Sequence, residues 1–210
     1  MSSIISHIYI SNILKEKYNL NNEFLYGAML PDVLTVAVNF KTKNTTHYLQ
    51  HGTLNGNEGD YPDIEKFIDE NKLSLPKNLM LQGYLAHLIE DMIWYSISIP
   101  NMAIKRDAQT VLYTKDNSIH SEEEFSKDIY SDYPIIDRYL LKNSNININE
   151  LQNEFLEISD DEGLKKAIKE NFKLFDLRNN RLNLVTEDIL KYYIETSLEK
   201  VSLVLDKIYK

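Results

Sequence analysis

The feature that most constrains the fold is the helical spacing of apolar residues in a chain with few helix breakers. The 210 residues include 6 glycines and 5 prolines. Apolar residues recur every three or four positions in most segments, whereas the alternation typical of strands is hard to find. The sequence therefore predicts an all-α fold, with about eight or nine helices in one domain spanning residues 1–210.

Several helix starts can be predicted from residues that cap the first turn. Ser121 and Glu124 have the spacing of a capping box, which predicts a helix over about 121–141 with a kink at Pro134. The other candidate caps are Ser2 or Ser3, for a helix running to about Lys17, then Asn21 or Asn22, Asn149, Asp160 or Asp161, and Thr186.

Three prolines are expected to mark helix boundaries. Pro31 is predicted to end the second helical segment and Pro100 to end the long helix that follows Pro76. Pro62 is predicted to occupy the first position of another helix. Between these segments, residues 38–61 are polar and rich in Asn and Gly, and we expect them to form a long loop of the kind that often carries function.

Two ionisable residues interrupt the apolar stretch GYLAHLIEDMIWY, residues 83–95. His87 and Asp91 lie four residues apart, so in a helix they project from one face with Cβ atoms about 6 Å apart. This spacing lets both side chains bind one cation. It also suits a buried pair that is hydrogen-bonded without a metal.

Other ionisable residues lie in similarly apolar segments. His7 is flanked by isoleucines, Asp32 follows the apolar run that ends at Pro31, and His47 follows a polar stretch. Taken singly, each has a structural explanation as a surface histidine, a helix cap or a loop residue. Together with His87 and Asp91 they supply imidazole and carboxylate groups, the ligands that suit zinc and similar divalent ions.

Composition excludes several other kinds of site. The chain contains no cysteine, so disulfides, thiolate zinc sites and thiol catalysis are excluded. The formal net charge of -9 argues against stable binding of nucleic acid. The N-terminal segment does not resemble a signal peptide, and no stretch of about 18 apolar residues predicts a transmembrane helix, so we expect a cytoplasmic protein. His-Asp dipeptides, His-Glu-x-x-His and Walker motifs are also absent.

The order of these residues resembles the zinc-dependent phospholipase C family. The resemblance covers roughly residues 1–100 and is carried by an early helical His7, Gly27 to Asp32 (GAMLPD), Thr46-His47-Tyr48, and Gly83-Tyr84 through His87 to Asp91. It implies an all-α fold around a buried cluster of metal ions, usually zinc, and hydrolysis of phosphoester or phosphodiester bonds by metal-activated water. S1/P1-type nucleases share this metal chemistry.

Carried over residue by residue, the resemblance implies one metal held by His47, His87 and Asp91. His7 and Asp32 would help to hold a second metal, with Asp91 as a possible bridge. Asp32 is also the candidate general base or water-orienting group. The expected cofactor is one or two zinc ions or another divalent metal, and the expected partner is a small phosphoester or a phospholipid-like substrate.

The sequence also departs from the family pattern. Secreted members use an N-terminal Trp as a ligand, whereas this chain begins with Met1. A third metal would need a further His-x-x-x-Glu pair, for which His120 and Glu124 are the candidates, although the capping box already accounts for Glu124. His51 is a possible extra ligand or proton donor. Three aromatic residues are candidates either for the walls of a cleft or for the core: Tyr48, Tyr84 and Trp94.

These departures leave two alternatives open. The chain could be a non-catalytic metal-binding or interaction protein on a degenerate phospholipase C scaffold, or a phosphodiesterase acting on nucleotides or nucleic acid. The sequence does not distinguish the native metal, the substrate or the oligomeric state.

Overall fold

The computed structural model describes residues 3–37, 43–55, 57–106, 109–172 and 182–209. The protein is mostly helical, as predicted, but two small antiparallel sheets are present, so a strictly all-α fold is wrong. In chain order the elements are α1 (Ile4–Tyr18), α2 (Asn22–Ala37), α3 (Lys43–Thr46), β1 (Leu49–Leu54), β2 (Asn57–Pro62), α4 (Ile64–Asn71), the 3₁₀ turn η1 (Leu75–Lys77), α5 (Leu79–Ile93), the π-helical turn η2 (Trp94–Ser98), α6 (Ile99–Met102), β3 (Ala103–Lys105), β4 (Thr110–Tyr113), β5 (Ile119–Ser121), α7 (Glu122–Lys142), α8 (Ile148–Ile158), α9 (Glu162–Asn171) and α10 (Glu187–Ile208).

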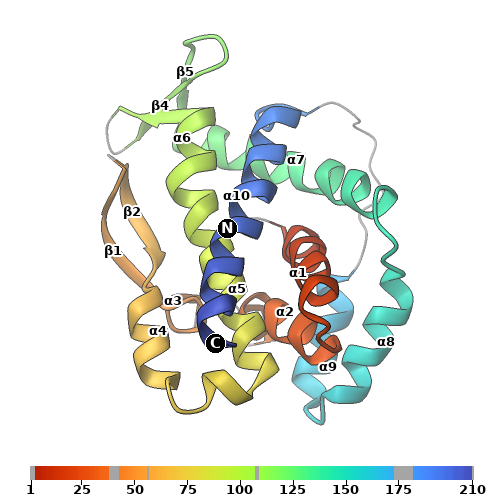
Figure 1. Ribbon diagram of the computed structural model, residues 1–210. Helices are drawn as coiled ribbons and strands as arrows, with labels where there is room; N and C mark the ends of the chain where they lie inside the picture. Colours follow the sequence, from red (N-terminus) through yellow and green to blue (C-terminus); the bar gives the residue numbers. More distant parts are fainter. Residues whose placement is uncertain (1–2, 38–42, 56, 107–108, 173–181, 210) are drawn as a thin grey trace.

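Helix α5 runs through the middle of the molecule (Figure 1). It packs most extensively against α2, and α10 crosses it in the front of the view. The β1–β2 hairpin and α4 lie on one side of α5, and α1 and α2 lie on the other. The buried apolar side chains form one core cluster that includes Leu85, Leu88 and Trp94. The apolar character of 83–95 therefore follows from the central position of α5.

Most of the predicted helix starts are confirmed. The Ser121 hydroxyl accepts a hydrogen bond from the Glu124 amide, and the Glu124 carboxylate accepts one from the Ser121 amide, which completes the capping box. The remaining confirmed caps, whose side chains accept a bond from an amide of the first turn, are Ser3, Asn21, Asp161 and Thr186. Ser2 lies outside the described residues. The cap predicted at Asn149 is wrong, because Asn147 caps a helix that begins at Ile148.

The three predicted proline boundaries are wrong. Helix α2 continues through Pro31 to Ala37, so Asp32 is a helical residue rather than the start of a turn. Pro100 lies in the first turn of α6, where its missing N–H needs no partner. Pro62 is the last residue of β2, and Asp63 caps α4 by accepting a bond of 3.0 Å from the Lys66 amide.

The loop predicted over residues 38–61 is largely regular structure. Residues 38–42 and 56 lie outside the described residues, but the rest includes α3 and the β1–β2 hairpin. Asn55, directly after β1, has a φ of 51°, a left-handed conformation that tight hairpin turns require. Gly52 pairs with Gly59 across the strands. The hairpin contacts α5 through β2.

Among the residues that the structure describes, no helix is both long and apolar enough to cross a bilayer.

Candidate metal centre

The five predicted ligands lie together at the centre of the molecule. Helix α1 contributes one, α2 one and α5 two, and the fifth follows directly after α3. Two overlapping groups have ligand atoms within 4.8 Å of one another: His7, Asp32 and His87 in the first, and His47, His87 and Asp91 in the second. Residues that are far apart in the sequence are thus brought together.

The close packing of α2 on α5 depends on two glycines. A Cβ added to Gly83 would lie 1.9 Å from the Phe24 carbonyl oxygen, and one added to Gly27 would lie 2.0 Å from the Met80 carbonyl oxygen. Both contacts are with backbone atoms, so any larger side chain would push the helices apart. This approach places the Ala28 carbonyl of α2 next to the His87 ring of α5.

His87 presents one ring nitrogen to the centre. Its Nδ1 donates a hydrogen bond of 2.7 Å to the Ala28 carbonyl oxygen, because a carbonyl can only accept. Nε2 is buried and has no hydrogen-bond partner, although it lies 3.4 Å from Asp91 Oδ2. Burial and the nearby charge of His7 lower the pKa of His87, which favours the neutral ring. Nε2 therefore carries a lone pair suited to a metal.

His7 lies against His87 with the two rings stacked at 3.7 Å between centroids. Its Nδ1 is 2.7 Å from Glu90 Oε2, and its Nε2 is 3.4 Å from Asp91 Oδ1. Burial alone would lower the pKa of His7, but the hydrogen bonds with Asp91 and Glu90 raise it to about 10. Without a metal, His7 is therefore an imidazolium held between two carboxylates.

His47 has the same orientation toward the centre. Its Nδ1 is 3.0 Å from the Thr46 hydroxyl and 3.4 Å from the Thr35 hydroxyl. Its Nε2 is 3.3 Å from Asp32 Oδ1 and 3.9 Å from Asp91 Oδ2. The three imidazoles thus share one design, in which Nδ1 contacts an outer partner and Nε2 faces the carboxylates. In metal sites such outer partners fix the tautomer and the ring orientation of the ligand.

Asp32 is the most accessible of the five ligand side chains, at 14% exposure. Burial acts to raise its pKa, but the hydrogen bond with His47 and the charges of the surrounding histidines lower it. Asp32 is therefore ionised at neutral pH, as both a ligand and a proton acceptor must be.

The imidazole and carboxylate groups of the centre suit a divalent metal. The number of lone pairs on each group limits how two ions could be bound. His87 belongs to both groups, but its one available lone pair, on Nε2, can bind one ion. A carboxylate has two oxygens and can bridge. A second ion would then need His7 and Asp32 together with a carboxylate oxygen of Asp91, whose Oδ1 lies 3.4 Å from His7 Nε2.

A pocket of about 170 Å³ leads from the surface to Asp91. Its walls come from the segment 43–49, from β2 and from the π-helical turn η2, which begins three residues after Asp91. On the hairpin, Gly59 lies so close to Tyr95 that an added Cβ would be 2.5 Å from the Tyr95 hydroxyl. Tyr61 and Tyr95 stack at 5.8 Å, which fixes the hairpin beside the pocket.

The other candidate ligands do not join the centre. His51 is exposed on β1, where its Nδ1 lies 2.9 Å from Asp60 Oδ1. His120 on β5 stacks on Tyr113 at 3.9 Å, and its Nδ1 is 3.9 Å from Glu124 Oε2. Neither belongs to a group that could hold a metal among the described residues. The geometry offers no third site at His120 and Glu124.

The candidate aromatic walls are packing residues instead. Trp94 is 1% exposed and contacts Tyr193 in the core. Tyr48 packs edge-on against Phe67, and the Tyr84 hydroxyl donates a hydrogen bond to the Thr46 carbonyl oxygen. Tyr84 therefore fixes the segment that carries His47, and the aromatic residue of the pocket is Tyr95.

Sequence reasoning missed Glu90, which is fully buried beside Asp91. Burial raises the pKa of this carboxyl despite the opposing bond with His7. Its other oxygen, Oε1, is buried without a hydrogen-bond partner. A signal was available, because Glu90 lies three residues after His87 and so falls near the same helical face.

Comparison with known proteins adds no identification. No protein-family model matches the chain, and neither the curated proteins nor the solved structures give a significant match.

Proposed function

We propose that this protein is a metal-dependent hydrolase of phosphoric esters that uses two divalent ions, most suitably zinc. One observation carries the proposal: three imidazole Nε2 atoms and two carboxylates converge in a buried centre, and the Nε2 of His87 has no hydrogen-bond partner there. The resemblance of His7, Asp32, His47, His87 and Asp91 to the ligands of the zinc-dependent phospholipases C supports the same reading.

In this proposal His47, His87 and Asp91 would hold the first ion, and His7 and Asp32 would help to hold the second, to which Asp91 could also contribute an oxygen. Paired divalent ions in such a site supply an activated water and neutralise negative charge on the phosphoryl oxygens. Neutral or carboxylate ligands of this kind suit zinc better than they suit magnesium or calcium.

The chain's own residues have separate tasks. Glu90, the Ala28 carbonyl and Thr46 hold the three imidazole rings so that each Nε2 faces inward. Asp32 is ionised and the most accessible ligand, so it is the group that accepts a proton from the attacking water at a carboxylate oxygen. The apolar surroundings of α5 exclude other water from the centre.

One observation favours the non-catalytic alternative. His120 and Glu124 lie apart from the centre, so the third metal of the secreted phospholipases has no counterpart among the described residues. A protein that binds metal without turnover would share the centre but not the chemistry. The nuclease alternative gains nothing from the geometry, because the pocket is small and the net charge is -9.

Metal content and turnover test the proposal together. We expect the zinc-treated protein to retain two ions after dialysis and to hydrolyse p-nitrophenyl esters of phosphate. His87→Ala should abolish turnover and reduce bound metal, whereas His51→Ala should change neither, because His51 is exposed on the hairpin. Two tightly bound ions without turnover of any phosphoester would favour the non-catalytic alternative. A wild-type protein that binds no divalent metal would refute both.

A further inference from the structure

The pocket above Asp91 has features that the hydrolase proposal does not yet use. One wall carries Lys43 and Asn44, whose side chains can donate hydrogen bonds to an anion. Lys43 is half-buried, and its ammonium forms no ion pair with the residues that the structure describes.

The acidic residue at the pocket is already paired. Asp60 on β2 lies 2.9 Å from the Nδ1 of His51, on the outer side of the hairpin. Lys43 is therefore the cationic side chain that lines the pocket, and this carboxylate is bonded to His51 rather than to its ammonium. Leu49, Pro62 and Tyr95 give the remaining wall an apolar surface.

The size of the pocket limits the shape of a ligand. Asp91 lines the pocket although it is only 2% exposed. A phosphoryl group that reaches Asp91 therefore shares the pocket with Lys43 and Tyr95, and its substituents must fit between the same walls. A volume of about 170 Å³ has room for one short substituent. A phosphodiester with two bulky groups needs a groove that is open on both sides of phosphorus.

We propose that the pocket selects small phosphomonoesters, and that Lys43 and Asn44 bind the phosphate oxygens that carry the second negative charge. This inference rests on the hydrolase proposal for the same centre. Hydrolysis joins the oxygen of water to phosphorus and breaks the bond from phosphorus to the ester oxygen. The products are inorganic phosphate and an alcohol, whose oxygen takes one of the water protons. A monoester carries about two negative charges near neutral pH, so it gains more from Lys43 than a diester with one.

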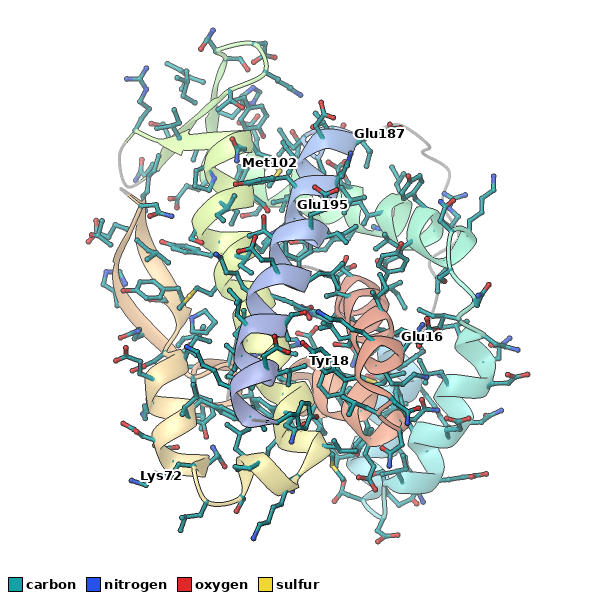
Figure 2. The ribbon with its side chains drawn as sticks, viewed as in Figure 1. Glu16, Tyr18, Lys72, Met102, Glu187 and Glu195 are labelled. Carbon is teal, nitrogen blue, oxygen red and sulfur yellow. The ribbon has the colours of Figure 1, made fainter. Side chains whose placement is uncertain are left out.

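Binding of inorganic phosphate to the zinc-treated full-length protein tests the anion site without any need for turnover. We expect Lys43→Met to weaken phosphate binding about tenfold or more, because it removes a charge-assisted contact. Lys43→Arg should restore most of it, and metal content should be unchanged in both variants. Lys72→Met is the matched control, since Lys72 is exposed at the far end of α4 (Figure 2). Unchanged phosphate affinity in Lys43→Met, with both ions bound, would overturn the proposal.

Turnover of two esters separates this inference from the hydrolase proposal. We expect wild-type kcat/KM to be at least about tenfold higher for p-nitrophenyl phosphate than for bis(p-nitrophenyl) phosphate, and Lys43→Met to raise KM for the monoester. Preference for the diester would overturn the substrate class and leave the hydrolase proposal standing. Absence of hydrolysis of either ester, combined with Lys43-dependent phosphate binding, would instead refute the hydrolase proposal and support the anion site.

Discussion

Two buried carboxylate sites in this molecule have opposite designs. Asp132 of α7 is fully buried and accepts hydrogen bonds from three consecutive backbone amides, those of Asn183, Leu184 and Val185, at 2.6, 2.8 and 2.8 Å. Its partners are fixed by the backbone and do not titrate. This carboxylate joins α7 to the segment that leads into α10, and its bonding leaves little capacity for a ligand.

The centre around Asp91 places carboxylates against imidazoles instead of backbone amides. Its partners are side chains that can lose a proton, and two of its buried atoms, His87 Nε2 and Glu90 Oε1, have no hydrogen-bond partner. Burial of a carboxylate is therefore no sign of function by itself. The informative difference is the hydrogen bonding of the buried atoms. The oxygens of Asp132 are fully used by backbone amides, whereas atoms of the centre such as His87 Nε2 keep lone pairs that no hydrogen bond uses.

The largest effect on stability is expected at Asp132. Asp132→Asn replaces an acceptor-only group by an amide whose N–H₂ cannot accept, so at least one backbone N–H is left buried and unpaired. We expect the free energy of unfolding to fall by roughly 2–4 kcal/mol. Urea denaturation measures this loss, and metal analysis should find the wild-type number of ions. Loss of metal in Asp132→Asn would contradict the division of the molecule into a structural and a functional carboxylate site.

The centre should respond in the opposite way. His87→Ala and Asp91→Ala each remove a proposed ligand of the first ion, so both should lose bound metal. Each also leaves a buried partner unpaired, and we expect the metal-free forms to lose about 1–3 kcal/mol of unfolding free energy. Dialysis followed by metal analysis, with denaturation in the presence of a chelator, measures the two effects separately. Unchanged metal content in both variants would show that His87 and Asp91 have only a structural role.

The helical framework was predictable from local patterns, and the five candidate ligands were named from their apolar surroundings and from a family resemblance. The spacing of apolar residues predicted the helices, and the i, i+4 spacing placed His87 and Asp91 on one face of α5. The hairpin was missed, although Asn55-Gly56 is a known turn signal, because the polar composition of the segment suggested a loop. Pro31 was misread because one missing N–H is a small loss in a helix that packs tightly on α5.

The rest of the centre could not be read from local patterns. The bond between His7 and Glu90 joins residues 83 positions apart, and the Ala28 carbonyl reaches His87 because Gly27 and Gly83 let the helices meet. Backbone acceptors have no signature in the sequence. Lys43 and Tyr95 become pocket residues through the packing of the hairpin and η2, which the sequence reading did not include.

A smaller effect is expected from substitution of Asp32, which tests whether the protein binds one ion or two. Asp32→Asn preserves shape and volume at a partly exposed position, so the fold should be retained. Metal occupancy should fall by about one ion, and phosphoester hydrolysis should fall about a hundredfold or more, since one of the two activating charges is lost. Titration of metal into the stripped wild type and the stripped variant measures the stoichiometry. Equal uptake by both proteins would refute the two-ion mechanism.

The smallest effect concerns the proton on His7. Only the centre around Asp91, and not the site at Asp132, should release a proton when metal binds. A metal requires neutral imidazole, whereas in the metal-free protein the pKa of His7 is raised to about 10 through its bonds with Asp91 and Glu90. Binding of metal at pH 7 should therefore release about one proton from His7, and none from His87, whose pKa is lowered. Calorimetry in buffers of different ionisation enthalpy measures this release.

The sign of the pH dependence follows from the same pKa. Because the folded pKa of His7 lies above the unfolded value of 6.5, its contribution to the stability of the metal-free protein is complete below pH 6.5 and is lost as the pH rises toward 10. Glu90→Gln removes one of the two carboxylates that raise this pKa, so both the loss of stability above pH 6.5 and the proton release at pH 8 should become smaller. Asp132→Asn serves as the control, because its buried carboxylate bonds backbone amides and should leave proton release unchanged. Equal proton release from the wild type and Glu90→Gln would show that Glu90 orients the His7 ring without setting its charge.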